Sequence, residues 1–142
     1  MNFLLDTNVV SEWVKPVPDR NVVAWLDGVD EDRVFLSVCT LAELRHGVER
    51  LPRGARRNRL ADWLENDLPQ RFEGRILPID AAVAHEWGRI VARAQTAGHP
   101  MSTMDAFIAA VAESRDLALV TREEGDFSGL GRPLINPWRA GG

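Results

Sequence analysis

Acidic side chains recur in this sequence where an apolar run, of the kind that forms a buried strand, gives way to a helical pattern. The first, Asp6, directly follows the apolar run at 3–5. The acids at comparable positions are Asp6, Glu43, Asp105, Glu123 and Asp126. In a parallel α/β sheet, strand ends and the helix starts that follow them share one edge. We therefore expect these acids to converge on one cleft.

Carboxylates gathered in one cleft repel one another, which raises their pKa values unless a cation neutralises them. This set contains no His or Cys, and a set made only of carboxylates suits a hard cation that prefers oxygen, such as Mg²⁺ or Mn²⁺. The chemistry typical of such sites is phosphoryl transfer, in which one or two metal ions activate water. The spacing of the acids therefore indicates metal-dependent chemistry on phosphate esters.

Each acid also has a simpler interpretation as part of a helix cap. Asp6 could cap the helix that follows it. Thr40 and Glu43 have the spacing of a capping box, and Ser102 and Asp105 form an acidic variant of it. Capping explains each acid singly, but it does not require an acid at each of four successive positions facing the crevice. The set as a whole favours a functional site.

The elements expected to position these acids alternate along the chain. Helical patterns of apolar residues separate short apolar runs that predict strands, which indicates an α/β domain with a mostly parallel sheet of about five strands. The predicted strands lie at 2–5, 33–37, 75–79, 117–120 and 133–135. The predicted helices begin near residue 9 and otherwise cover 21–29, 40–51, 57–68, 80–95 and 103–114. The prolines expected between elements are Pro16, Pro18, Pro52, Pro69 and Pro100.

Length and composition favour a single domain over residues 1–142, because 142 residues suffice to bury a core. The apolar runs are too short to span a membrane, and no basic segment of a signal peptide precedes them. Cys39 is the only cysteine, which excludes an internal disulfide. We expect a cytoplasmic protein. Its formal net charge of −4 argues against a basic field over the whole surface, although arginines cluster at 50–59.

Five motifs occur in an order and at spacings that resemble PIN-domain proteins of the VapC toxin type, within the FitB-like branch. The resemblance extends from Asn2 to Trp138. The motifs are LLDTNVVSE at 4–12, LSVCTLAELRHG at 36–47, MDAFIAAVA at 104–112, LALVTREEGDF at 117–127 and PLINPW at 133–138.

The resemblance implies a three-layer α/β/α fold and a Mg²⁺- or Mn²⁺-dependent endoribonuclease. It implies the toxin of a type II toxin–antitoxin pair, bound by a cognate VapB-like antitoxin, and a homodimer or a larger assembly with that antitoxin. The expected reaction is attack of a metal-activated water on an RNA phosphodiester, which leaves a 3′-hydroxyl and a 5′-phosphate.

Matched residue by residue to the family, Asp6 and Asp105 would hold the metal, and Glu43 would bind it or position the water. The fourth acid is open: the family has Asn or Asp where this chain has Glu123, so Glu123 and Asp126 are both candidates. The residues that match orienting positions, or that could help them, are Asn8, Thr121 and Thr40. The arginines that could bind RNA or the antitoxin are Arg45, Arg53, Arg56, Arg57 and Arg59.

Two rival functions remain to be weighed. A PIN-like module without activity would bind RNA or protein, and the intact set of acids argues against it. A phosphatase of the haloacid dehalogenase kind also begins with a strand that ends in Asp, but it needs a second acid two residues later. Here that position is Asn8, and no lysine follows Lys15.

Overall fold

A five-stranded sheet lies at the centre of the computed structural model, which describes residues 1–139. The strand order is β3-β2-β1-β4-β5, and all four neighbouring pairs are parallel. The strands are β1 (Phe3–Leu5), β2 (Val34–Ser37), β3 (Ile76–Leu77), β4 (Ala118–Val120) and β5 (Leu134–Ile135). Each falls within a run that the sequence predicts as a strand, and the prediction of a parallel sheet is confirmed.

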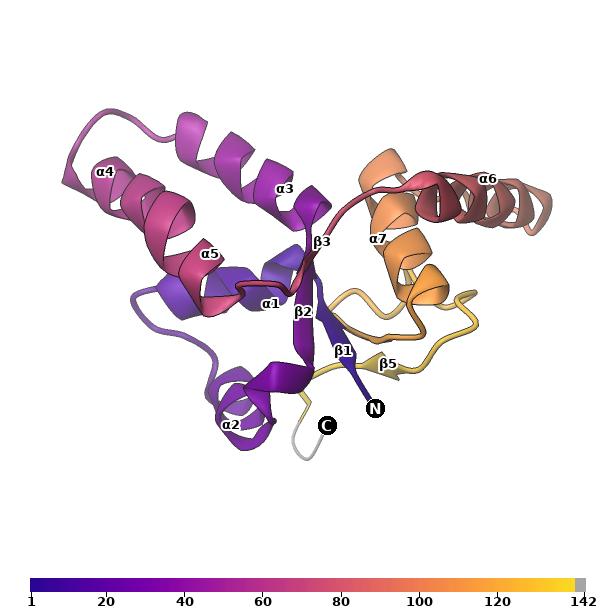
Figure 1. Cartoon of the computed structure of the whole chain (residues 1–142), viewed down its shortest axis with the longest axis horizontal. Helices are drawn as coiled ribbons and strands as arrows, with labels where there is room; N and C mark the ends of the chain where they lie inside the picture. Colours follow the sequence, from indigo (N-terminus) through magenta and orange to yellow (C-terminus); the bar gives the residue numbers. More distant parts are fainter. Residues whose placement is uncertain (140–142) are drawn as a thin grey trace.

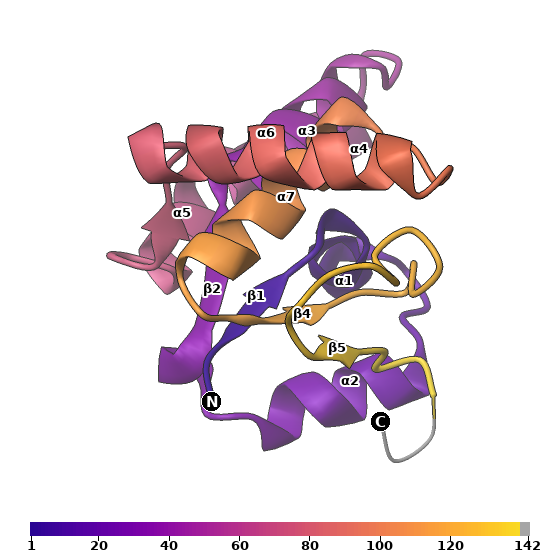
Figure 2. The same ribbon diagram turned by 90° about the vertical axis from the view of Figure 1, so that its right-hand side faces the viewer.

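Helices cover both faces of the sheet and complete the three predicted layers (Figure 1). The helices on one face are α1 (Thr7–Ser11) with the 3-10 turn η1 (Glu12–Val14), α2 (Arg20–Gly28), α3 (Val38–Glu49), α4 (Ala55–Asp62) and α5 (Leu68–Arg71). A short 3-10 turn, η2 (Glu31–Arg33), leads into β2. On the other face α7 (Thr103–Ser114) crosses the sheet, and α6 (Ala81–Thr96) packs against α7 (Figure 2). No helix within residues 1–139 is long and apolar enough to cross a membrane.

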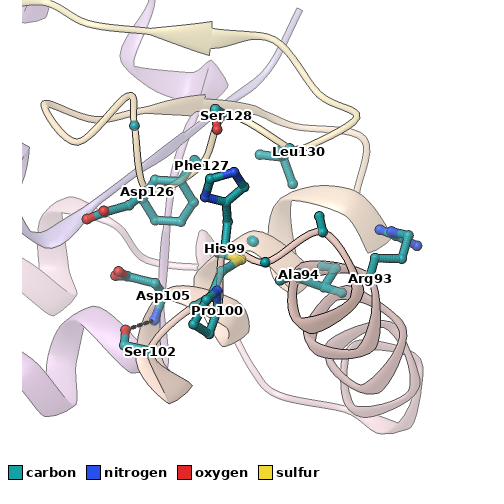
Figure 3. A pocket seen from close by; sticks show the side chains of 17 residues that line it. Arg93, Ala94, His99, Pro100, Ser102, Asp105, Asp126, Phe127, Ser128 and Leu130 are labelled. Atoms are coloured by element: carbon teal, nitrogen blue, oxygen red, sulfur yellow. Dashed lines mark hydrogen bonds between the residues drawn. The ribbon is translucent and has the colours of Figure 1, made fainter.

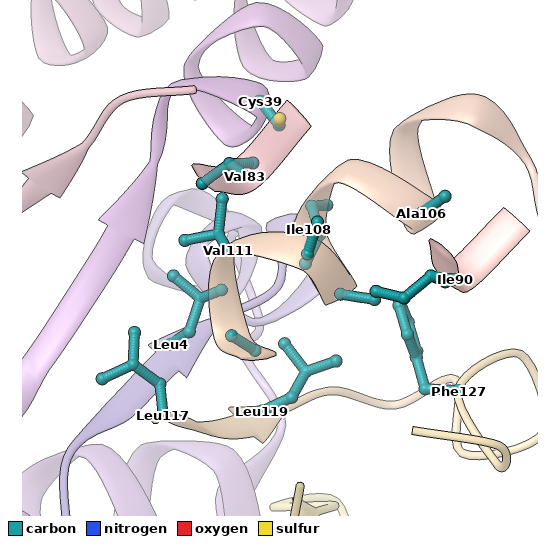
Figure 4. Packing of buried hydrophobic residues seen from close by; sticks show 13 residues of the cluster. Leu4, Cys39, Val83, Ile90, Ala106, Ile108, Val111, Leu117, Leu119 and Phe127 are labelled. Atoms are coloured by element: carbon teal, nitrogen blue, oxygen red, sulfur yellow. The ribbon is translucent and has the colours of Figure 1, made fainter. Parts of the chain in front are cut away.

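The core is divided by the sheet into two apolar clusters. Successive side chains of a strand point to opposite faces. Leu4 accordingly packs with α6 and α7, whereas Leu5 packs with the helices of the opposite face. Figure 4 shows Leu4 and Leu119 facing α7, a helix whose buried side includes several alanines. These small side chains suit close packing of α7 on the sheet, at the strand ends where the acids lie.

One proline departs from its predicted place. Pro69 is expected between elements, but it lies in the first turn of α5, and the prediction is wrong. The chain runs from α4 to α5 through a π-helical turn, η3 (Trp63–Asp67), in which the backbone N–H of Leu68 donates to the carbonyl of Trp63. Asp67 and Leu68 have helical backbones, so the helix continues through this turn into α5, and the shifted hydrogen bonds of the π-helical turn accommodate a proline, which has no N–H to donate.

The strand order reverses beside β1. The chain passes outward from β1 to β2 and β3, and then returns to β4 on the other side of β1. In open α/β sheets, ligands bind in the crevice at the carboxyl ends of the strands where the order reverses. Here that point lies between the ends of β1 and β4, where the backbone N–H of Asp6 donates to Val120 O at 2.9 Å.

Candidate metal centre

Asp6 lies at the carboxyl end of β1 and is only 5% exposed. One carboxylate oxygen accepts the backbone N–H of Thr7 at 2.8 Å, so Asp6 caps α1. The other accepts the hydroxyl of Thr121, at the end of β4, at 2.8 Å, and the amide of Asn8 at 3.4 Å. A cap needs neither burial nor a second set of donors. Asn8 and Thr121 therefore lie where the sequence predicts orienting residues.

Burial, together with the smaller effect of the charges of Asp105 and Glu43, raises the pKa of Asp6 from 3.8 to about 6. The hydrogen bonds from Thr121 and Thr7 oppose this rise because they favour the ionised carboxylate. Holding a buried negative charge beside two others is unfavourable, and a bound cation would relieve this cost.

Glu43 lies on the second turn of α3 and contacts the same strand end. The hydroxyl of Thr7 donates to Glu43 Oε1 at 2.6 Å and lies 3.1 Å from the hydroxyl of Thr40. The capping-box interpretation of Glu43 is wrong, because α3 begins earlier: its N-cap is Ser37, whose hydroxyl accepts the N–H of Thr40. Thr40 is thus part of the helix and reaches the acids through Thr7.

Asp105 lies in the first turn of α7, and its backbone N–H donates to the hydroxyl of Ser102 at 3.2 Å. Ser102 is the N-cap, so the predicted acidic capping pattern is present. Burial is the largest cause that raises the pKa of the Asp105 carboxyl, opposed by the Ser102 hydroxyl. The charges of Asp126, Glu43 and Glu123 raise it further. The Asp105 carboxyl therefore belongs to the helix cap and also interacts with three other acids.

The structure distinguishes the acids that follow β4. Asp126 lines the same hollow as Asp105 and raises the pKa of Asp105 more than Glu123 does. The backbone N–H of Glu123 donates to the Thr121 hydroxyl at 3.0 Å. Glu124 accepts from Asn136 at 3.1 Å and pairs with Arg139 at 2.7 Å. Of the two candidates for the fourth acid, Asp126 is the one that shares this hollow with Asp105.

The donor set fits a hard divalent cation. Within residues 1–139, no three His, Cys, Asp or Glu side chains stand close enough to hold a metal ion together. Mg²⁺ does not require such a cage, because it keeps several waters and is commonly bound by one or two carboxylates and the phosphates of a substrate. Asp6 and Asp105, of which the second raises the pKa of the first, supply two carboxylates of this kind.

The five arginines singled out by the sequence separate into three groups. Arg45 pairs with Glu65 at 2.9 Å and Glu49 at 3.7 Å, and Arg57 pairs with Glu49 at 3.3 Å. No described contact links Arg45 to the acids of the cleft. Arg56 differs, because it lines a hollow of about 220 Å³ that also borders Glu43. Two further arginines of the cluster are exposed: Arg53 and Arg59.

Sequence reasoning did not single out Arg122, which directly follows Thr121. Its backbone N–H donates to Asn8 Oδ1 at 3.4 Å, and its guanidinium lies 5.3 Å from the ring centroid of Trp138. Its guanidinium makes no ion pair with an acid in the described part of the chain. The position of Arg122 inside the motif at 117–127 could have marked it as a candidate site residue. Its contact with Trp138 could not be predicted, because that contact depends on the path of the chain after β5.

The fold and these contacts can be compared with known proteins. The PIN domain family matches residues 3–132. Toxin FitB of Neisseria gonorrhoeae is 43% identical over 135 residues, which cover 95% of this chain and 97% of that protein. VapC ribonuclease Y4jK of Sinorhizobium fredii is 38% identical over 135 residues, covering 95% and 96%. The crystal structure of FitAcB from Neisseria gonorrhoeae gives a TM-score of 0.91 at 42% identity, covering 96% of this chain and 99% of that chain.

Proposed function

Since this chain belongs to the PIN-domain family, we propose that it is a Mg²⁺- or Mn²⁺-dependent endoribonuclease and the toxin of a toxin–antitoxin pair. Asp6 carries the proposal: its carboxylate is buried where the strand order reverses, with a pKa raised to about 6 by burial and by the charges of Asp105 and Glu43. The toxin and the ribonuclease among its relatives support RNA as the substrate.

A divalent cation held by Asp6 and Asp105 would polarise a phosphodiester and activate water for in-line attack. The protein fixes Asp6 for this role through donors to both carboxylate oxygens, one from Thr7 and one from Thr121. Fixed donors place a carboxylate without reorganisation during the reaction. Asp126 lies beside Asp105 in the same hollow and would complete the acidic set.

Glu43 is proposed to orient the attacking water and accept its proton. Its Oε1 is held by the Thr7 hydroxyl, and Oε2 makes no hydrogen bond with residues 1–139, which leaves that oxygen for water. The proton removed from water passes to Glu43, while the leaving ribose oxygen takes a proton from solvent. Cleavage in this direction leaves a 3′-hydroxyl and a 5′-phosphate.

A cleavage assay tests the proposal and separates it from the inactive binding module. Purified protein is incubated with total RNA in Mn²⁺, in Mg²⁺ and in EDTA. We expect cleavage with either metal, none in EDTA, and a loss of about 10³-fold in the Asp105→Asn variant with an unchanged far-ultraviolet circular dichroism spectrum. Asp67→Asn is the matched control, because Asp67 is exposed and lies outside the cleft. Cleavage that persists in EDTA or in Asp105→Asn would refute the assignment.

The products give a second readout. Fragments with a 5′-phosphate are substrates for a 5′-phosphate-dependent exonuclease, whereas fragments with a 5′-hydroxyl are not. Resistance of the fragments to that exonuclease would exclude the proposed direction of cleavage, even if the reaction needs metal.

The partner proposed for this toxin is a small antitoxin. A hollow of about 220 Å³ between α1, α3 and α4 is lined by apolar side chains that include Leu44, Leu60 and Trp63, with Glu43 and Arg56 at its border. An apolar segment that carries a charged residue would fit this surface and cover Glu43. Co-expression with the product of the adjacent reading frame, followed by size-exclusion chromatography, tests both the complex and the proposed homodimer or larger assembly.

A further inference from the structure

A second hollow has a volume of about 650 Å³. It adjoins Asp105 and Asp126, whereas the hollow that Arg56 borders adjoins Glu43. It lies between the turn that joins α6 to α7 and the segment that follows β4. Asp105 and Asp126 belong to its wall, and we call it the α6–α7 hollow. Its volume falls within the range of small-molecule sites, roughly 300–1,000 Å³.

The wall of the α6–α7 hollow is mostly apolar, with charged groups at its two ends. Figure 3 shows the carboxylates of Asp105 and Asp126 at one end, Arg93 at the other, and His99 between them. The buried ring of Phe127 is part of the apolar wall. Arg93 is held only loosely, 3.7 Å from Glu86, and its side chain is 58% exposed.

The turn that carries His99 is fixed by its backbone. After the last residues of α6, Gly98 adopts a left-handed conformation with φ of 77°. The N–H of Gly98 donates to Gln95 O at 3.1 Å, and the N–H of His99 donates to Ala94 O at 3.0 Å. This pair of bonds is the Schellman motif, in which a left-handed glycine closes a helix. The motif places His99 at a defined position on the rim of the hollow.

We propose that the α6–α7 hollow binds a nucleobase of single-stranded RNA, adjacent to the phosphate that is cleaved. This inference rests on the proposed ribonuclease function, since it places the scissile phosphate at the acidic end. An unstacked base has an apolar face for the wall and can stack on an imidazole or an aromatic ring. Arg93, at the far end, would meet the next phosphate of the strand.

Two positions of the wall in the segment after β4 carry no side chain. Gly125 and Gly129 both line the hollow, and a Cβ added at either would meet no other heavy atom within 4 Å. Neither glycine has a left-handed backbone, so their conformation does not require glycine. At these two positions, in the segment that contains Asp126, the wall of the hollow is therefore formed by backbone alone.

Binding of mononucleotides in EDTA tests this inference without cleavage. The four nucleoside 5′-monophosphates and ribose 5-phosphate, which lacks a base, are titrated into the protein while the imidazole signals of its three histidines are followed by NMR. We expect at least one nucleotide to bind about tenfold more tightly than ribose 5-phosphate and to shift the His99 signal. Equal affinity for ribose 5-phosphate and for all four nucleotides would overturn the inference.

Two substitutions locate the binding. Ala94→Trp should fill the hollow, and His99→Ala, at an exposed position, should remove the stacking surface. Each should weaken nucleotide binding about fivefold or more. Each should also lower kcat/KM for RNA by a larger factor than for bis(4-nitrophenyl) phosphate, which has no base. Ala92→Trp is the matched control, because Ala92 is exposed on the same helix and does not line the hollow.

The outcomes separate this inference from the function on which it rests. If the parent protein hydrolyses neither RNA nor the diester, the proposed function fails whatever the nucleotides do. If the parent hydrolyses both and neither substitution alters nucleotide binding or the preference for RNA, only the base-binding inference fails. Loss of antitoxin binding in Ala94→Trp with unchanged nucleotide binding would assign the hollow to the antitoxin and overturn the inference. Should Ala94→Trp not fold, His99→Ala alone decides.

Discussion

Asp6→Asn should make the metal-free protein more stable at neutral pH, although it should abolish cleavage. The pKa of Asp6 is raised from 3.8 to about 6, so ionising this carboxyl opposes folding above that pH. The difference corresponds to about 3 kcal/mol at pH 7.5. Asn keeps the shape, but its amide nitrogen cannot accept, so at least one of the three hydrogen bonds that the carboxylate accepts is lost, which costs about 1 kcal/mol. The net gain expected is about 2 kcal/mol.

The size of this stabilisation by Asp6→Asn should depend on pH. A raised pKa in the folded state means that the protonated carboxyl favours folding at low pH, and that this contribution is lost as the pH rises through about 6. At pH 4, the two proteins should therefore be nearly equal in stability. Adding Mg²⁺ at pH 7.5 should stabilise the parent and have less effect on Asp6→Asn, because a ligand stabilises only the state that binds it.

Urea unfolding in EDTA at the two pH values measures both effects. The exposed control Asp67→Asn should change the free energy of unfolding by less than about 0.5 kcal/mol at either pH. A loss of stability in Asp6→Asn at pH 7.5, or a gain that is as large at pH 4, would refute the reasoning, because the charge of Asp6 would then carry no folding cost.

Three further predictions concern the same cleft. Thr121→Val removes the hydroxyl that donates to Asp6 and should cost about 1–3 kcal/mol at pH 7.5 and less at pH 4, measured by urea unfolding; equal losses would contradict it. Mn²⁺ should bind about tenfold more weakly at pH 5 than at pH 7.5 by calorimetry, because Asp6 must lose its proton; an unchanged affinity would exclude this. Arg56→Ala should weaken RNA or antitoxin binding, whereas Arg45→Ala, already paired with acids, should have little effect; fluorescence anisotropy with each partner distinguishes them.

The strands of the sheet could be predicted from the sequence because they are short and apolar and are separated by helical patterns. Which strands lie next to one another could not be predicted in this way. Asp6 and Thr121 lie far apart in the chain, and their contact depends on β4 returning to the free side of β1. The motif placed both residues at strand ends, whereas only the folded chain brings one hydroxyl to one carboxylate.

Local ambiguity explains the errors. Ser37 and Thr40 are both residues that cap helices, and the sequence alone cannot tell which ends the strand. The folded chain decides, since Ser37 is the last residue of β2 and its hydroxyl accepts the N–H of Thr40. The π-helical turn before Pro69 inserts an extra residue into a helix that otherwise has ordinary apolar spacing, so no periodic signal marked it. The α6–α7 hollow likewise depends on how a turn and a distant loop approach each other.

That Asp6 and Asp105 hold one divalent cation is tested most directly by crystals of the protein soaked in Mn²⁺, with the metal located by anomalous scattering. The expected result is an anomalous peak with oxygen atoms of both carboxylates coordinated to it, absent from crystals of Asp6→Asn treated alike. Ordered Mn²⁺ elsewhere in the parent, with no peak that touches Asp6, would contradict the metal centre from which the function is inferred.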